Sequence, residues 1–141
     1  MMVGALLATA GTIYLVLSGL HLFYTFLDAR RPRYLAPEDP ALVTAMQTAR
    51  IRLSRGEMTM WQGWITFNYT HSIGGLVFGG LCIVLALSLG RFPVSPWALL
   101  VLAGISGLYL WQGVRYWFRT PRTGVLLATL CLVAAWLVYA L

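Results

Sequence analysis

Four long runs of apolar residues alternate with short polar stretches along the chain. The runs cover about residues 2–27, 58–89, 97–118 and 124–141. A helix of about 20 apolar residues crosses a hydrocarbon core of about 30 Å, so each run is long enough to span a membrane. We therefore predict an all-α, integral membrane four-helix bundle that forms a single domain over residues 1–141.

The polar stretch 28–57 is the one sizeable segment outside the predicted spans. Asp39 and Pro40 are typical of a helix N-cap and of the first helical position after it. Apolar residues then recur at helical spacing: Leu42, Ala45, Met46, Ala49 and Leu53. This pattern predicts a short helix lying in the membrane interface. A plain cytoplasmic connector helix is the alternative.

Positive charge is concentrated in two of the connections. Six of the ten arginines lie between Arg30 and Arg55, and three more lie within residues 115–123. Only Arg91 lies elsewhere, in the short turn before the third span. Cytoplasmic loops of membrane proteins collect basic residues. We therefore expect a multi-pass protein of the bacterial inner membrane, with loops 28–57 and 115–123 in the cytoplasm and both termini outside.

Composition excludes a water-soluble globule. The chain is 60% hydrophobic and 10% charged, with a mean hydropathy of +0.77, whereas soluble domains carry about 25% charged residues. The net charge of +6 indicates attraction to anionic lipid headgroups rather than to nucleic acid. Cys82 and Cys131 stand alone in apolar runs, which favours packing over a disulfide or a cysteine metal site.

Two segments of the chain resemble each other. Residues 17–24 and 105–112 match at a constant offset of 88 positions. Both lie in spans that run outward to inward, so the fold could consist of two parallel-repeated helical hairpins. Chance similarity in apolar sequence is the alternative. In a true repeat, His21 would correspond to Tyr109.

Polar residues follow one face in each of the first three spans. Because polar groups are costly against hydrocarbon, we expect these faces to turn towards one another. By helical rise, His21 and Asn68 lie about 10 Å from the cytoplasmic boundary and His71 lies about 15 Å from it. This predicts a polar pocket, rimmed by aromatic residues, in the cytoplasmic half. Its residues are His21, Tyr24, Trp64, Asn68, His71, Tyr109, Gln112 and Arg115.

A mostly apolar cavity with few convergent polar groups is typical of a site for amphiphiles. We therefore expect the protein to bind a lipid, a quinone or a similar lipophilic ligand, or to serve as an accessory subunit. Membrane lipids are its expected partners. The G-x-x-x-G pattern of Gly75 and Gly79 permits close helix approach and leaves a homo-oligomer or a larger membrane complex open.

Two alternative functions use the same histidines. His21 and His71 could be the axial ligands of haem b, although their expected depths differ by about 5 Å. A small membrane enzyme could instead use His21, His71 and Asp28 as acid–base groups. No nucleophile stands out, so no catalytic residue is assigned. Two histidines without convergent carboxylates are too few for a divalent metal site.

The segment from Trp64 to Gly74 contains the run Phe67-Asn-Tyr-Thr-His-Ser-Ile-Gly, and Gly19-Leu-His21 precedes it in the first span. With these motifs the chain resembles small four-helix bacterial inner-membrane proteins that carry a Phe-Asn-x-Ser/Thr-His-Ser-x-Gly segment. The resemblance implies that Asn68 and His71 belong to one site. The resemblance does not imply any activity.

Overall fold

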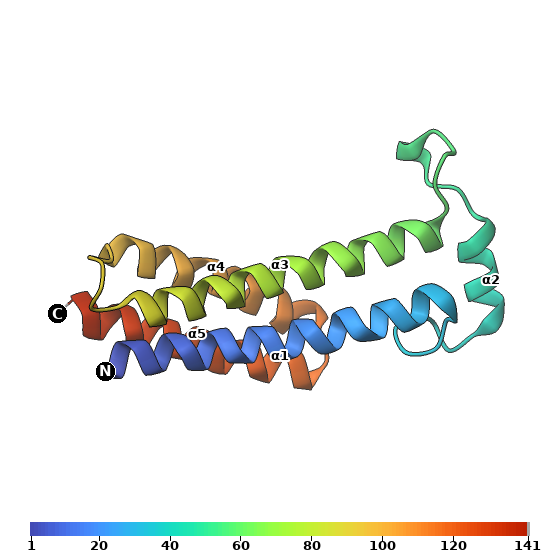
Figure 1. The fold of residues 1–141 in the computed structure, drawn as a ribbon. Coiled ribbons are helices and arrows are strands. Elements are labelled where there is room, and N and C mark those ends of the chain that lie inside the picture. The colour runs from blue at the N-terminus through green and yellow to red at the C-terminus, as the bar shows by residue number, and fades with distance from the viewer. Residues whose placement is uncertain (141) are drawn as a thin grey trace. The chain divides into compact units, whose positions relative to one another are not determined.

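The computed structural model describes residues 1–140, so Leu141, the last residue of the predicted fourth span, lies outside it. The elements are α1 (Met2–Arg30), α2 (Pro40–Thr48), the 3-10 turn η1 (Arg52–Ser54), α3 (Met60–Ser88), α4 (Pro96–Tyr116) and α5 (Arg119–Ala140). Within the described residues no β-strand forms. Four of the helices, α1, α3, α4 and α5, are long and apolar enough to cross a membrane. The prediction of an all-α membrane four-helix bundle is confirmed (Figure 1).

The chain divides into two compact units. The core unit comprises Met1–Leu17 and Gly75–Leu141, and the loop unit comprises Ser18–Gly74. Helices α1 and α3 each contribute one half to each unit, whereas α4 and α5 belong wholly to the core unit.

The connection between α4 and α5 is shorter than predicted. Within the loop expected over residues 115–123, only residues 117 and 118 lie outside a helix, because α5 begins at Arg119. Pro121 stands in the first turn of α5, where backbone N–H groups have no acceptor within the helix, so its missing N–H is tolerated. The ends of the other three membrane helices lie within three residues of the predicted bounds.

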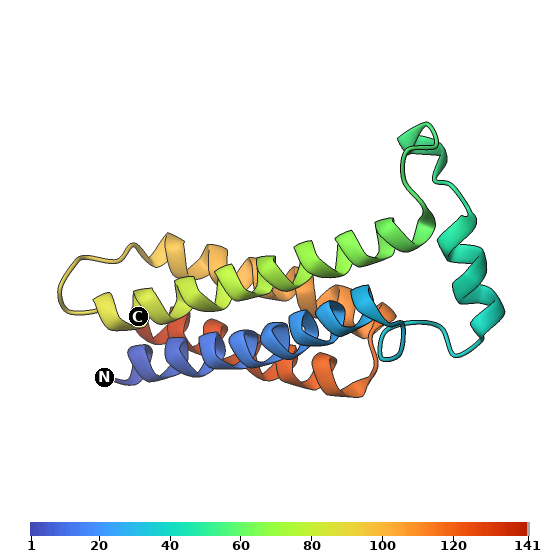
Figure 2. The ribbon, with the colours of Figure 1, turned by 45° about the vertical axis from the view of Figure 1, so that its right-hand side comes forward.

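Helix α2 begins as its cap predicted. The Asp39 carboxylate accepts a hydrogen bond of 2.8 Å from the Ala41 N–H, and Pro40 occupies the first helical position. In Figures 1 and 2, α2 runs crosswise past the end of α1 and the start of α3. The short helix predicted in this loop therefore forms, and its position in the membrane interface stays a prediction.

The expected continuation of this helix to Leu53 is wrong. The helix ends at Thr48, and Ala49 is extended, with ψ at 130°. The Ala49 carbonyl accepts a hydrogen bond of 2.9 Å from the Met60 N–H, so it pairs with the start of α3 instead of with the next helical turn. Residues 49–60 form a compact projection that we call the arginine hairpin.

In the core unit, α1 and α3 pack closely and antiparallel. A Cβ atom added at Gly11 would lie 2.7 Å from the Gly79 carbonyl oxygen, and one at Gly79 would lie 2.8 Å from the Gly11 carbonyl oxygen. Towards the start of α1, Gly4 faces Ala86 in the same way, at 3.5 Å. The close approach expected at Gly79 therefore occurs within the chain, against α1.

The turn from α3 to α4 depends on a left-handed residue. Gly90 has a φ of 87°, and the N–H groups of Arg91 and Phe92 both donate to the Ser88 carbonyl. Ser95 then caps α4 with its side chain. The tight turn makes α3 and α4 antiparallel, and the ring centroids of Phe78 and Tyr109 lie 6.4 Å apart.

The hydrophobic core consists of side chains from all four membrane helices of the core unit. Its buried members are Leu7, Ala10, Tyr14, Phe78, Cys82, Leu99, Leu102, Ala103, Val125, Ala128, Leu132 and Ala135. Small residues recur among them, as expected where helices associate by close packing in lipid. Figures 1 and 2 show the start of α1 and the end of α5 at the same end of this unit.

Candidate functional site

His21 and Asn68 form a side-chain hydrogen bond between α1 and α3 in the loop unit. The His21 Nε2 atom lies 2.9 Å from Asn68 Oδ1. Asn68 Nδ2 donates to the Trp64 carbonyl at 2.7 Å, which leaves its oxygen facing the imidazole. Because that oxygen can only accept, Nε2 carries the proton, and Nδ1 of a neutral His21 presents a lone pair.

His71 completes what we call the histidine cluster, which consists of His21, Asn68 and His71. The two imidazole centroids lie 5.5 Å apart at an interplanar angle of 77°, an edge-to-face contact. Phe67 stacks on the His71 ring at 5.9 Å. Asn68 is only 4% exposed, whereas both histidines are half-buried. The structure thus brings the two histidines and the asparagine of the predicted site together.

Two hydroxyl side chains near the cluster bond to backbone carbonyls of their own helices. The Ser72 hydroxyl donates to the Asn68 carbonyl at 2.7 Å, and the Thr25 hydroxyl donates to the His21 carbonyl at 2.8 Å. Both hydroxyl residues are fully buried. Each hydroxyl therefore has its hydrogen-bond partner four residues earlier in its own helix.

Trp64 and Tyr24, which we predicted for the rim of the pocket, lie close along their helices to the histidine cluster. Trp64 lies one helical turn before Asn68 and Tyr24 nearly one turn after His21, and both side chains are exposed. The Tyr24 ring contacts the rings of Tyr34, at a centroid distance of 5.0 Å, and of Phe23, at 6.0 Å. Such amphipathic rings are typical of the membrane–water boundary.

Asp28 is fully buried, and backbone groups of the following loop occupy both of its oxygens. Oδ1 accepts from the Arg33 N–H at 3.1 Å and the Tyr34 N–H at 2.9 Å, and Oδ2 accepts from the Leu35 N–H at 2.6 Å. The carboxylate therefore closes the loop onto the end of α1. These bonds do not support the acid–base role considered for Asp28.

Tyr109, Gln112 and Arg115, which we also predicted for the site, belong to the core unit. The Tyr109 ring packs edge-on against Tyr14, with centroids 5.9 Å apart. The Arg115 guanidinium lies 5.6 Å over the Trp111 ring. Gln112 and Arg115 are both exposed.

A buried hydroxyl network in the core unit escaped the sequence analysis. The Tyr14 hydroxyl lies 2.8 Å from Ser106 Oγ, which lies 2.7 Å from Thr129 Oγ1. Together these residues tie α1, α4 and α5. Serine and threonine in membrane helices often bond to their own backbone, as Thr129 also does to the Val125 carbonyl. Sequence alone therefore gave no signal that distinguished Ser106 and Thr129.

Haem ligation is the alternative use of the two imidazoles. Bis-histidine haem needs the porphyrin between the rings and one nitrogen of each ring on the iron. Here the rings contact each other directly, and Nε2 of His21 faces Asn68. Within residues 1–140, no group of three or more His, Cys, Asp or Glu side chains gathers as metal ligands would.

As the structure describes it, the cluster offers hydrogen-bonding groups. It combines a histidine held in one tautomer, a second histidine in ring contact with it, and an exposed aromatic ring, Phe67, on two membrane helices. No family model, no curated protein and no solved structure matches the chain.

Proposed function

We propose that this protein is a multi-pass protein of the bacterial inner membrane that binds an amphiphile, a lipid or a quinone, with its polar end at the histidine cluster. The observation that carries the proposal is the hydrogen bond between His21 and Asn68, with the His71 ring against His21. A half-buried imidazole within a membrane helix is costly against hydrocarbon, and a polar ligand group at Nδ1 of His21 reduces that cost.

The chemistry of the cluster favours a ligand that carries a hydroxyl or carbonyl group. Nδ1 of a neutral His21 accepts a hydrogen bond from a quinol or a glycerol hydroxyl, and in the imidazolium form it donates to a carbonyl or a phosphate. Apolar side chains are exposed on α1 and α3 near the level of the cluster, namely Leu20 on α1 and Phe67 on α3. They provide a surface along which the ligand's apolar chain can lie.

The distribution of arginine supports the proposed orientation. Basic residues collect in the loop after α1 and around the connection after α4, which by the positive-inside rule are cytoplasmic. The amphiphile would then enter from the inner leaflet. The resemblance of the Phe67–Gly74 segment to small bacterial inner-membrane proteins also supports a shared role for Asn68 and His71.

Mass spectrometry of organic extracts tests the proposal. The protein and its variants are purified in mild detergent after reconstitution with phosphatidylethanolamine, phosphatidylglycerol and a quinone. Wild type should retain one amphiphile in a stoichiometric amount, and His21→Ala and His71→Ala should lose it. Thr70→Ala is the matched control, because this exposed hydroxyl bonds only to carbonyls of its own helix.

Equal retention by wild type and both histidine variants would overturn the proposal, as would a wild type that retains no amphiphile. An absorption spectrum of the same preparations, grown with haem in excess, tests the alternative. A Soret band that is lost in both histidine variants would establish haem binding instead.

A further inference from the structure

Hydrogen bonds between its two arms hold the arginine hairpin together. Its arms pair through the Ile51 N–H, which donates to the Met58 carbonyl at 3.0 Å, and through the bond from Met60 to Ala49. Ser54 bridges the arms from inside, since its Oγ donates to the Ile51 carbonyl at 2.8 Å and accepts from the Met58 N–H at 3.1 Å. The backbone of the hairpin therefore satisfies much of its own hydrogen bonding.

The tip of the hairpin makes a sharp turn. Arg55 and Gly56 both have positive φ, at 52° and 88°, which turns the chain sharply. The Arg50 guanidinium donates to the Gly56 carbonyl at 2.9 Å. One arginine therefore braces the tip, and its neighbours in the hairpin, Arg52 and Arg55, remain exposed.

The base of the hairpin packs against the first turn of α3. A Cβ atom added at Gly63 would lie 2.6 Å from Cδ1 of Ile51, so the isoleucine lies directly on the α3 backbone. Figures 1 and 2 show the hairpin extending sideways from the start of α3, at the level of its first turns. Because α3 crosses the membrane, a sideways projection at its end lies along the plane of the lipid headgroups.

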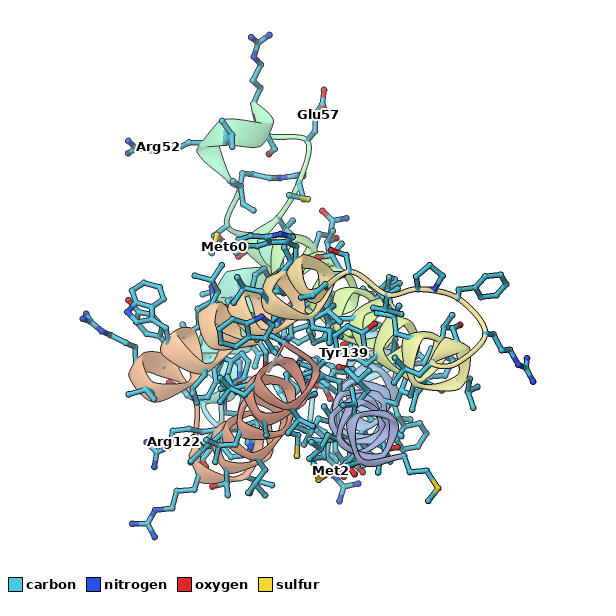
Figure 3. All side chains as sticks on the ribbon, turned by 90° about the vertical axis from the view of Figure 1, so that its left-hand side faces the viewer. Met2, Arg52, Glu57, Met60, Arg122 and Tyr139 are labelled. Atoms are coloured by element: carbon cyan, nitrogen blue, oxygen red, sulfur yellow. The ribbon has the colours of Figure 1, made fainter. Side chains whose placement is uncertain are left out.

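The tip combines an apolar side chain with basic ones. Leu53 is 94% exposed and stands between Arg52 and Arg55. Figure 3 shows Arg52 and Glu57 on the hairpin, away from the start of α3 at Met60. An exposed leucine flanked by arginines is typical of a segment that seats its apolar side chain below the headgroups and its guanidinium groups on phosphates.

Glu57 is the one carboxylate in the hairpin beside its three arginines, so residues 49–60 keep a net charge of +2. The chain has four acidic residues in all. Asp28 is buried against the backbone N–H groups of its loop, and Asp39 caps α2. The positive charge of the hairpin is thus available to an anionic partner.

We propose that the arginine hairpin is a binding site for anionic phospholipids in the leaflet at the start of α3. Arg52 and Arg55 contact the headgroup phosphates, and Leu53 inserts among the first acyl carbons. The site is separate from the histidine cluster and does not depend on the function proposed for it.

Native mass spectrometry tests the site in nanodiscs made from equal parts of phosphatidylglycerol and phosphatidylcholine. Wild type should retain phosphatidylglycerol in preference to phosphatidylcholine. The double variant Arg52→Gln/Arg55→Gln should lose roughly fivefold of that preference for each arginine. Arg91→Gln, in the turn between α3 and α4, removes a charge outside the hairpin and should keep the wild-type preference.

Hydrogen–deuterium exchange of residues 49–60 gives a second readout. We expect slower exchange in phosphatidylglycerol nanodiscs than in phosphatidylcholine ones, and we expect Leu53→Ser to reduce that difference without unfolding α3. An unchanged lipid preference in the double variant would overturn the proposal, as would an equal loss in Arg91→Gln. Protection that appears in native membranes but not in phosphatidylglycerol nanodiscs would also overturn it and indicate a protein partner.

Discussion

At the scale of single residues, the polar side chains of the membrane helices differ in what they bind. The side-chain amide of Asn68 donates a hydrogen bond to a carbonyl of its own helix, and its oxygen accepts one from His21. Both carboxylate oxygens of Asp28 accept hydrogen bonds from backbone N–H groups. Both residues lie on the polar faces that the sequence predicted, yet one belongs to the histidine cluster and the other closes a loop.

The bond between His21 and Asn68 predicts a specific tautomer. In wild type, nitrogen-15 NMR of labelled histidine should show neutral His21 with its proton on Nε2, because Asn68 Oδ1 can only accept. Asn68→Leu should mix the tautomers and lower the free energy of unfolding by about 1 kcal/mol, as for other hydrogen bonds between membrane helices. Thr70→Ala should change neither the tautomer of His21 nor the free energy of unfolding. A proton on Nδ1 in wild type would contradict the geometry.

Asp28→Asn should loosen the loop after α1. An amide keeps one accepting oxygen and turns a donor towards backbone N–H groups, so bonds to a charged group are lost, at about 2 kcal/mol. Hydrogen–deuterium exchange should become faster at Arg33, Tyr34 and Leu35. Asp39→Asn is the matched control, because asparagine caps a helix as well as aspartate does. Equal exchange in the two variants would show that the Asp28 bonds contribute little.

At the scale of elements, the ends of helices followed the sequence wherever a local signal set them. Asp39 and Pro40 began α2, as their cap pattern predicted. The prediction was wrong where a distant partner intervened. Ala49 and Leu53 continue the helical spacing of α2, but Met60 pairs with Ala49 and pulls the chain into the arginine hairpin.

Two adjacent glycines of α3 should respond differently to the same substitution. A Cβ atom at Gly79 would lie 2.8 Å from the Gly11 carbonyl oxygen, whereas one at Gly80 meets nothing within 4 Å. Gly79→Ala should therefore force α1 and α3 apart and cost about 1–3 kcal/mol, as overpacking does. Gly80→Ala should be neutral or stabilising, since alanine favours a helix. Thermal unfolding in detergent measures the stability of the two variants. Equal melting temperatures would contradict the close contact between Gly79 and Gly11.

At the scale of the whole molecule, the chain is a multi-pass membrane protein whose core unit is built by all four membrane helices. Small buried residues and the hydroxyl network of Tyr14, Ser106 and Thr129 hold that unit together. In lipid, such packing and interhelical hydrogen bonds replace the hydrophobic drive of a soluble core. The loop unit carries the histidine cluster and the arginine hairpin.

The proposed orientation predicts which exposed residues face the cytoplasm. Leu53→Cys, on the arginine hairpin, should react with a membrane-impermeant maleimide only after the cells are permeabilised. Phe92→Cys, in the turn between α3 and α4, should react in intact cells. Both positions are exposed in the structure, and the native Cys82 is buried, so a Cys131→Ala background limits competing labelling. The reverse pattern would place the arginine-rich loop outside.

The sequence by itself determined the number of membrane helices, most of their ends and the polar faces they carry. The length of an apolar run and a helix cap both depend on residues that are neighbours in the sequence, so the sequence alone reveals them. Only the tertiary structure decided which polar groups meet: His21 with Asn68 across 47 positions, Ser106 with Thr129 across 23, and Ala49 with Met60. Hydrogen bonds between distant residues depend on how helices and loops pack, and no local pattern specifies that.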